Sequence, residues 1–452
     1  MNGDTVAAIS TPIGEGGIGI VRLTGPDAID IAARLFRSAR GVSLETVPTH
    51  TLHYGRIVAA GRSVDEVLVS ILRAPRTYTR EDVVEVNCHG GVVATRAVLD
   101  AVLAAGARMA ERGEFTKRAF LNGRISLDQA KAVLDVVKAR TALGLEAAVD
   151  RLGGRFSDAL EEVRGALADV LADLEVGIDY PDLDVHAEAI LPRIDDLARR
   201  VGRMLDESER GRVVREGLTI AIIGRPNVGK STLLNALLAE ERAIVTPIPG
   251  TTRDTVEEEA SLGGIPVRWI DTAGLRRPCD PVEAEGVRRT ERAIDRSDLV
   301  LCLLDRGEPL AAEDREILER TWDVPSMLVV NKSDLPDRLG GDVPGSFEEE
   351  LDVSAKTGDG IDDLRDAILR RLVGGELPTR NSVLLLDAWE RDLVRRVGAA
   401  LHGAAETVRG GGTADMIAEE LRLAYLTAGE LQGIDVSESI LDAVFSRFCV
   451  GK

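Results

Sequence analysis

The hydrophobic pattern along the chain changes three times, and each stretch predicts a different kind of structure. In residues 1–120, short runs of apolar and β-branched residues alternate with turn signals. The last of these runs ends at Gly90-Gly91, just before a stretch rich in Ala and Val that favours a helix. We therefore predict a small α+β domain over residues 1–120, with strands at 18–23, 51–58, 67–72 and 83–88.

A helical pattern follows in residues 121–213, where apolar residues recur at intervals of three and four. This spacing places them on one face of a helix. The clearest set comprises Leu160, Val163, Leu167, Val170, Leu171 and Leu174. Amphipathic helices bury such faces against one another, so this stretch predicts the first part of a helical bundle.

From Gly217 to residue 373, strand-like runs alternate with helical stretches. Alternation of this kind is typical of a doubly wound and mostly parallel sheet. The expected strands are 218–223, 267–270, 299–304, 327–330 and 351–353. We predict that this α/β domain covers residues 214–376.

Helical patterns return after Gly374-Gly375 and Pro378, over residues 377–452. The expected apolar faces contain Ile417, Leu421 and residues 423–426 in one helix, and Ile440, Leu441, Val444 and Phe445 in another. Helices on both sides of the α/β stretch predict one discontinuous helical domain. The α/β domain would then be inserted between two of its helices, as domain insertions succeed at exposed loops.

Composition describes an ordinary globular chain. Its 452 residues are 44% hydrophobic and 29% charged, and the length allows roughly three domains. No apolar run is long enough to span a bilayer and no export signal begins the chain, so we expect no membrane partner and a cytoplasmic location. The four cysteines, Cys88, Cys279, Cys302 and Cys449, are too far apart for a CxxC metal motif or a disulfide framework.

The net charge of −20 opposes broad binding to nucleic acid, because the summed field repels a polyanion. An RNA partner would therefore need a local basic patch. The candidate cluster of cations comprises Arg108, Arg112, Lys117, Arg118, Arg124 and Lys131. The alternative interpretation of this cluster is a solvated helix face.

Residues 224–231, GRPNVGKS, follow an expected strand and precede an expected helix that starts near Thr232. This arrangement is typical of a phosphate-binding loop, because glycines let backbone N–H groups surround the phosphates at a helix N-terminus. Lys230 would reach the β- and γ-phosphates, and the Ser231 hydroxyl would ligate Mg²⁺. The segment therefore predicts a nucleotide pocket.

Three further segments end expected strands: the first would serve Mg²⁺ and the γ-phosphate, and the other two point to guanine. Asp271 could reach the Mg²⁺ shell, while the backbone of residues 272–274 could meet the γ-phosphate. In NKSD at 331–334, the Asp334 carboxylate can accept from both N1–H and N2–H₂ of guanine, a pair that adenine lacks. The backbone amide of SAK at 354–356 can meet O6. Together these segments predict a Ras-like α/β P-loop GTPase domain.

The segment GTTRD at 250–254 suits a switch loop, since it is polar and lacks periodicity. Either of its threonine hydroxyls could complete the Mg²⁺ shell, and we choose Thr252. Leu275 stands where Ras-like GTPases carry a glutamine that orients water. Another group must therefore orient the water, and an arginine or some other cation must offset the charge of the transition state.

Five segments carry a resemblance to a known family: 224–231, 250–254, AEELRLA at 418–424, GEF at 113–115 with RAFLN at 118–122, and FCVGK at 448–452. They resemble the tRNA modification GTPases known as the MnmE or TrmE family, over almost the whole chain. The terminal C-[ILV]-G-K pattern is absent from related ribosome-assembly GTPases.

The resemblance implies a GTPase activated by K⁺, whose G domains pair across a homodimer. Asn227 would ligate the K⁺ with backbone carbonyls of Thr246, Ile248 and Thr251. The residues expected to contact GTP are Asn227, Val228, Gly229, Lys230, Ser231, Thr232, Thr246, Thr251, Thr252, Asp271, Thr272, Ala273, Gly274, Asn331, Lys332, Asp334, Ser354, Ala355 and Lys356.

The resemblance also implies the catalytic residues. The first is Lys230. The second is a glutamate in the V-E-x-x-G pattern, which would hold the attacking water through a second water and which matches at Glu283. Residues 277–279 depart from the family pattern, so Glu285 is the alternative. The third candidate, Cys449, would be a nucleophile near a folate pocket, although a packed terminal cysteine is the other interpretation.

A tetrahydrofolate derivative, 5-formyl- or 5,10-methylene-tetrahydrofolate, is the implied one-carbon carrier. By the same resemblance its contacts would be Arg22, Glu81, Arg124 and Lys452, where Arg124 replaces a frequent lysine. Without the resemblance, each of these residues would be interpreted as part of an ordinary surface ion pair.

The implied function is modification of the wobble uridine of tRNA to its 5-carboxymethylaminomethyl or 5-aminomethyl form. The family works in a heterotetramer with the flavin-binding subunit MnmG (GidA). A ribosome-assembly module that uses GTP as a timer is the second hypothesis, opposed by residues 1–120 and the terminal motif. A GTP-gated iron transporter would need membrane spans.

Overall fold

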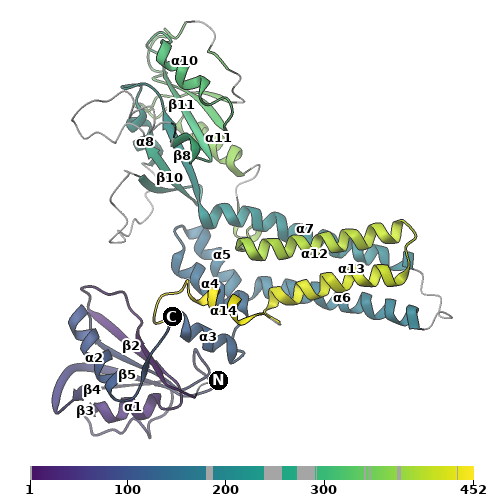
Figure 1. Ribbon diagram of the computed structural model, residues 1–452. Coiled ribbons are helices and arrows are strands. Elements are labelled where there is room, and N and C mark those ends of the chain that lie inside the picture. The colour runs from purple at the N-terminus through teal and green to yellow at the C-terminus, as the bar shows by residue number, and fades with distance from the viewer. Residues whose placement is uncertain are drawn as a thin grey trace. The chain divides into compact units, whose positions relative to one another are not determined.

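The computed structural model describes residues 3–179, 187–238, 257–271, 291, 293–340, 343–345, 347, 349–373, 378–434 and 436–452 (Figure 1). The chain forms two compact units. The first contains residues 1–134, 152–165 and 425–452, and the second contains residues 135–151 and 166–424.

A seven-stranded sheet forms most of the first unit, in the order β3-β4-β5-β6-β2-β1-β7. The strands are β1 (Val6–Ile9), β2 (Ile18–Thr24), β3 (Phe36–Ser38), β4 (Thr51–Ala59), β5 (Arg62–Leu72), β6 (Val83–His89) and β7 (Arg108–Met109). All neighbours pair antiparallel except β1 and β7, which pair parallel. The four strands expected from the sequence are confirmed.

Helices α1 (Ala28–Leu35) and α2 (Val92–Ala104) pack on one face of this sheet. Alternate strand residues such as Val67, Val69 and Ile71 are buried in the core beneath them. The intervening residues point to the other face of the sheet, which explains the period of two in the sequence. On that face Tyr54 and Leu68 stand opposite each other and are exposed.

Short helices complete the first unit beside the sheet: α3 (Glu114–Leu121), the start of α4 (Leu127–Lys138), and α14 (Glu438–Phe445). Phe445 and Phe448 pack against Ala130 and Val133 of α4 in a small apolar core. Gly113 has φ +68°, and a Cβ there would lie 2.8 Å from the Phe445 carbonyl oxygen. Only glycine therefore allows α3 and the C-terminal segment to approach so closely.

The long helices are α5 (Ala142–Leu152), α6 (Arg155–Asp179), α7 (Ala187–Glu216), α12 (Ala388–Arg409) and α13 (Ala414–Gln432), with a 3-10 turn η1 (Arg380–Ser382) before α12. Helix α12 packs along α7 (Figure 1). All six residues of the predicted face from Leu160 to Leu174 are buried, so that prediction is confirmed. The prediction for residues 423–426 is wrong in part, because Leu423 and Leu426 are exposed while Ala424 is buried.

The second unit contains a six-stranded sheet in the order β13-β12-β11-β8-β10-β9. Its strands are β8 (Leu218–Ile223), β9 (Glu257–Leu262), β10 (Ile265–Asp271), β11 (Leu299–Asp305), β12 (Ser326–Asn331) and β13 (Glu350–Asp352), and its helices are α8 (Lys230–Leu238), α10 (Ala312–Glu319) and α11 (Ile361–Val373). Every pair is parallel except β9 with β10. The prediction of a mostly parallel α/β sheet is confirmed.

Both faces of this sheet are covered, because alternate residues of each central strand belong to different cores. Ile220, Ile222 and Leu301 pack with α8 and α11, whereas Ala221 and Cys302 pack in the core on the other face. Burial on both sides explains why these strands are continuous apolar runs in the sequence. Within the part of the chain that the structure describes, no helix combines the length and apolarity needed to cross a membrane.

Candidate functional site

Four strands of the α/β sheet end beside one another at its carboxyl edge. The loop 224–229 follows β8, Asp271 ends the neighbouring β10, and residues 332–334 and 354–356 follow β12 and β13. Parallel strands bring their carboxyl ends to one edge, where open α/β sheets bind ligands. The fold thus gathers segments that lie up to about 130 residues apart in the sequence, as the arrangement of parallel strands requires.

The loop 224–229 is shaped by left-handed backbone conformations at Gly224, Asn227 and Gly229, with φ of 155°, 67° and 101°. A Cβ on Gly229 would lie 2.3 Å from Nδ2 of Asn331, so this close approach requires glycine. The buried Lys230 folds back into the loop, and its Nζ donates to the carbonyl oxygens of Gly224 (2.6 Å) and Arg225 (2.8 Å). The loop therefore carries a buried ammonium at the N-terminus of α8.

Asn331 joins two of these loops. Its Nδ2 donates to the Val228 carbonyl oxygen (2.8 Å), and its Oδ1 accepts from the Ala355 backbone amide (3.0 Å). Its side chain is buried. Sequence reasoning assigned Asn331 to the nucleotide, and its role as a tether between loops depends on contacts that only the fold reveals.

Asp305, at the end of β11, was not predicted as a site residue. It forms an ion pair with Lys332, whose Nζ also donates to the Asn227 carbonyl oxygen (3.1 Å). This contact holds Lys332 beside the phosphate loop, and Lys332 itself has φ 65°. The sequence signal that could have identified Asp305 as a site residue is its position at the carboxyl end of a buried strand.

Asp334 is exposed, and its Oδ1 accepts a hydrogen bond from the Ser354 hydroxyl (2.7 Å). Its Oδ2 has no hydrogen-bond partner among the described residues. The carboxylate is therefore oriented on one side and open on the other, which is the arrangement that a base donating two hydrogen bonds requires. The neighbouring Lys356 is exposed.

Several predicted residues lie outside the described part of the chain: Thr246, Ile248, Thr251, Thr252, Thr272, Ala273, Gly274, Glu283 and its alternative Glu285. For Asp271 the strand is described and the side chain is not. The proposed switch loop, the K⁺ ligands and the water-holding glutamate therefore stay predictions.

A second group of candidate residues lies in the first unit, around the C-terminal segment. Arg22 on β2 pairs with Glu85 on β6 (2.8 Å), and its Nη1 donates to the Gly451 carbonyl oxygen (3.4 Å). Ser10 also donates to that oxygen (3.1 Å). Gly451 has φ +95°, and a Cβ there would clash with the backbone of Ile9 at 2.2 Å. The fold thus brings Gly451 of the C-terminal segment beside Arg22.

Glu81 lies at the centre of a charge network. Its carboxylate accepts from the Thr24 hydroxyl (2.9 Å) and from Nη1 of Arg118 (3.2 Å). Arg118, which was not predicted as a site residue, is buried and also pairs with Glu114 (2.8 Å). Burial raises the pKa of Glu114, but hydrogen bonds and charge from Arg108 and Arg118 outweigh it and lower the pKa overall.

Four of the six cations of the basic cluster at 108–131 are paired or buried within the fold, whereas Arg112 and Arg124 are exposed. Arg108, Lys117 and Arg118 each pair with a carboxylate, and Lys131 is buried. For these four residues both interpretations made from the sequence are wrong, because Lys117 meets Asp442 from a distant segment and Arg108 and Arg118 share Glu114.

Arg124 lies over the ring of Tyr78 at 4.8 Å, and its Nη1 donates to the Tyr78 carbonyl oxygen (3.1 Å). The Tyr78 hydroxyl hydrogen-bonds Thr116 (3.0 Å). Burial raises the pKa of Tyr78, and the nearby charges of Arg124 and Arg22 act in the opposite direction. Tyr78 thus lies within reach of two of the four predicted folate residues.

The cysteines differ sharply in exposure. Burial raises the pKa of Cys88 to about 11 and that of Cys302 to about 12, so both are inert thiols at neutral pH. Cys449 is exposed, so its interpretation as a packed terminal cysteine is wrong. Lys452 is half-buried, and its backbone amide donates to the Cys449 carbonyl oxygen (3.4 Å).

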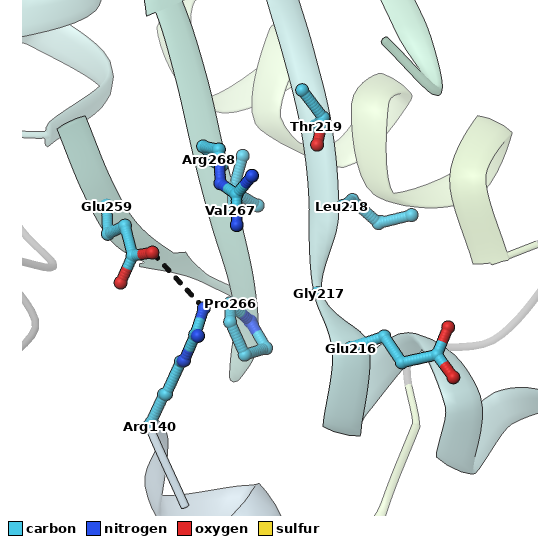
Figure 2. A pocket seen from close by; sticks show the side chains of 9 residues that line it. All are labelled: Arg140, Glu216, Gly217, Leu218, Thr219, Glu259, Pro266, Val267 and Arg268. Atoms are coloured by element: carbon cyan, nitrogen blue, oxygen red, sulfur yellow. Dashed lines mark hydrogen bonds and ion pairs between the residues drawn. The ribbon is translucent and has the colours of Figure 1, made fainter. Parts of the chain in front are cut away.

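A cavity of about 230 Å³ lies at the amino ends of β8 and β10, away from the nucleotide motifs (Figure 2). Leu218 and Thr219 from β8 and Pro266, Val267 and Arg268 from β10 line it. Figure 2 shows the ion pair between Arg140 and Glu259 (3.2 Å) beside it. Because the phosphate loop follows the opposite end of β8, this cavity is not the nucleotide site.

The parallel sheet, the phosphate loop and the tethered guanine motif define a P-loop GTPase domain. Residues 5–124 match the family model described as the GTP-binding protein TrmE N-terminus, and residues 127–449 match the MnmE helical domain. The chain belongs to the MnmE (TrmE) family of tRNA modification GTPases. The predictions of this family and of a GTP-hydrolysing enzyme are confirmed.

The similarity extends over whole chains. The chain is 45% identical over 459 residues to the tRNA modification GTPase MnmE of Geobacillus kaustophilus (strain HTA426), covering 99% of each. It is 46% identical over 471 residues to that of Heliobacterium modesticaldum (strain ATCC 51547 / Ice1), covering all of both. Among solved structures, the FeoB G-domain from Methanococcus jannaschii matches 34% of this chain and 97% of its own, with 25% identity and a TM-score of 0.24.

Proposed function

We propose that this chain is a K⁺-dependent GTPase that takes part in 5-carboxymethylaminomethyl or 5-aminomethyl modification of the wobble uridine of tRNA. It would act with the flavin-binding subunit MnmG and use a one-carbon unit from a tetrahydrofolate derivative. The observation that carries the proposal is the whole-length similarity to tRNA modification GTPases of the same family. The terminal C-V-G-K segment beside Arg22 supports the folate part.

In the nucleotide pocket, each described residue has a task that its position supports. Lys230 would exchange the carbonyl oxygens of Gly224 and Arg225 for phosphate oxygens, since its ammonium already lies within the loop. Asp334 would accept two hydrogen bonds from guanine, because Ser354 fixes its orientation. This pairing would select GTP over ATP by leaving the carboxylate unsatisfied with adenine.

The donor groups suit the two proposed ions. Ser231, in the first turn of α8, would hold Mg²⁺ with Thr252, as hydroxyl oxygens are ligands of hard cations. The Asn227 side chain is exposed and hydrogen-bonds no described residue, so its oxygen is available to K⁺ together with the carbonyls of Thr246, Ile248 and Thr251. When bound, these ions would offset negative charge on the phosphate oxygens.

In the first unit, Arg22, Glu81, Arg124 and Lys452 would hold the folate. Glu81 can accept N–H groups from a heterocycle, since Thr24 and Arg118 already orient its carboxylate. Arg124 presents a guanidinium over an aromatic ring, an arrangement that favours an anionic group of the ligand. Cys449, exposed near this site, would be the catalytic thiol.

The domain organisation is also part of the proposal. The N-terminal domain would cover residues 1–120, and the helical domain residues 121–213 and 377–452, with the G domain of residues 214–376 inserted between them.

A homodimer would form through the exposed face of the first sheet. This face is apolar, since Ile18, Leu52, Tyr54 and Leu68 are all exposed on it. The location would be cytoplasmic.

Nucleoside analysis of tRNA from cells that lack this chain tests the function. The modified wobble uridine should disappear and should return when the gene is restored. Unchanged modification would overturn the proposal. A matched kinetic test exchanges K⁺ for Na⁺ at constant ionic strength, where kcat for GTP should fall by at least roughly tenfold if a bound K⁺ stabilises the transition state.

A further inference from the structure

A second cavity, of about 540 Å³, lies beside Arg124 in the first unit. Its charged lining consists of Arg76, Arg80 and Arg124, with the His50 imidazole beside them, whereas Leu72, Pro75 and the Tyr78 ring give it apolar surface. The remaining lining residues are uncharged, so no carboxylate faces this space among the described residues. A cavity with this lining suits a ligand that carries several negative charges.

The chain as a whole carries a net charge of −20, so three arginines around one space form a local positive region. Elsewhere in the same unit, Arg22, Arg108 and Arg118 each pair with a glutamate. By contrast, neither Arg76 nor Arg80 nor Arg124 forms an ion pair with any described residue. Their guanidinium groups therefore retain their charge for an external partner, and a carboxylate can engage such a group through two parallel hydrogen bonds.

The backbone holds these side chains in place. Arg80 has φ 60°, and its Nη1 donates to the Asn122 carbonyl oxygen (2.9 Å), while the Asn122 side chain donates to the Thr79 carbonyl oxygen (2.6 Å). His50 has φ 61°, and its amide donates to the carbonyl oxygen of Ile71 (2.7 Å). These contacts fix the loops that present Arg80 and His50.

Left-handed backbone at residues other than glycine is costly and gathers at functional sites. Five such residues occur in the described part of the chain: His50, Ala60, Arg80, Asn227 and Lys332. Asn227 and Lys332 lie in the nucleotide site, and His50 and Arg80 line this cavity. The same kind of strain thus marks both places.

The cavity is continuous with the proposed folate residues through Tyr78, which faces the cavity and carries Arg124 on its ring. Tyr78 packs against Phe115 in one apolar cluster, and the guanidinium of Arg22 lies over the Phe115 ring at 5.7 Å. If one end of a ligand lies at Arg22 and its other end lies at Arg124, the end at Arg124 would extend into the cavity, because Arg124 lines it.

We propose that this cavity binds the carboxylates of the glutamate tail of the folate ligand, so that the chain prefers folates with several γ-linked glutamates. The inference rests on the proposed folate function and deepens it. Each added glutamate brings one carboxylate, and Arg76 and Arg80 offer two guanidinium groups beyond Arg124. The net charge of −20 disfavours a long RNA backbone, which would be repelled beyond this local region, relative to a short tail of carboxylates.

The test measures binding of 5-formyl-tetrahydrofolate monoglutamate and triglutamate to the full-length chain by calorimetry. The triglutamate should bind about tenfold more tightly, because two further carboxylates meet arginines. The double variant Arg76→Gln/Arg80→Gln should abolish this preference while leaving the monoglutamate affinity unchanged, which also shows that the variant is folded. Arg62→Gln, an exposed arginine in the same sheet outside the cavity, is the matched control and should keep the preference.

The outcomes separate the two proposals. If neither folate binds, the proposed folate function fails. If both folates bind with equal affinity, the folate function stands and the tail site is overturned. A double variant that keeps the triglutamate preference but loses affinity for tRNA would also overturn it and would assign the cavity to RNA. Raising the salt concentration should reduce the triglutamate preference, since the pairs are partly solvated.

Discussion

Replacing Arg151 by methionine should destabilise the second unit strongly, because this arginine joins three helices within the unit. Arg151 on α5 has a side-chain exposure of 1%, and its Nη1 donates to Asp135 on α4 (3.0 Å). Its Nη2 donates to Glu390 on α12 (2.6 Å). Arg215 on α7 pairs with the other oxygen of Asp135 (3.1 Å), which extends the network to a fourth helix.

The magnitude follows from what the substitution leaves behind. Methionine fills a similar volume, but Asp135 and Glu390 stay buried with one cation fewer. Removing one partner of a buried ion pair costs about 3–5 kcal/mol, since the remaining charge is uncompensated. For a unit of this size, the apparent Tm should fall by roughly 5–15 °C.

Thermal unfolding of the full chain, followed by far-ultraviolet circular dichroism, is the assay. Arg140→Met is the matched control, because the Arg140–Glu259 pair has side-chain exposures of 50% and 49%. Solvent screens such a pair, so its loss should cost at most about 1 kcal/mol. Equal melting temperatures for the two variants would refute the reasoning.

The pH dependence gives an independent check. Burial raises the pKa of Asp135, and the charges of Arg151 and Arg215 oppose this effect. Without Arg151 the pKa should rise further. A carboxyl whose folded pKa lies above its unfolded value of about 3.9 stabilises the fold while protonated and loses that contribution as the pH rises through the folded pKa. The deficit of the variant should therefore shrink as the pH is lowered from neutrality, and a deficit that is constant with pH would contradict this account.

Three shorter predictions concern the active groups. Asn331→Ala removes both hydrogen bonds that join the two nucleotide loops, so GTP affinity should fall about 10- to 100-fold in a titration with a fluorescent GTP analogue; an unchanged affinity would contradict the tether. Glu283→Ala should abolish hydrolysis with little loss of GTP affinity, and an unaffected kcat would transfer the role to Glu285. Cys449→Ser should leave GTP hydrolysis intact and stop tRNA modification, whereas normal wobble-uridine content in cells with only that variant would make the thiol dispensable.

Periodicity predicted the large elements well, because burial follows spacing wherever a helix or strand has one dominant neighbour. The face from Leu160 to Leu174 is an example, with all six residues buried. The prediction fails at Leu423 and Leu426, since residues 423–426 occupy more than half of a helical turn and cannot all point one way. Short strands were also missed: β9 begins with three glutamates, a residue that is depleted in strands, so its sequence does not resemble a strand.

The nucleotide motifs could be predicted because each is contiguous in sequence and follows a strand. The residues that orient these motifs through hydrogen bonds and ion pairs could not be predicted from the sequence. Asp305 pairs with Lys332 across 27 positions, and Arg118 meets Glu81 across 37 positions. No local sequence pattern marks either pair: the first depends on β11 and β12 becoming neighbours, and the second on α3 meeting the loop before β6.

The cavity beside Arg124 illustrates the same limit more strongly. Its basic residues come from three separate segments around His50, Arg80 and Arg124, so no linear motif marks it. Composition argued against a binding site for a polyanion, because the chain is acidic as a whole. A site for a polyanion depends on local potential rather than on net charge, and local potential depends on which cations lack carboxylate neighbours. Arg108 and Arg118 stand in the basic stretch 108–131 and are neutralised by acidic partners. Arg76 and Arg80 have no ion-pair partner among the described residues, and Tyr78 and Arg124 connect their cavity to the proposed folate site.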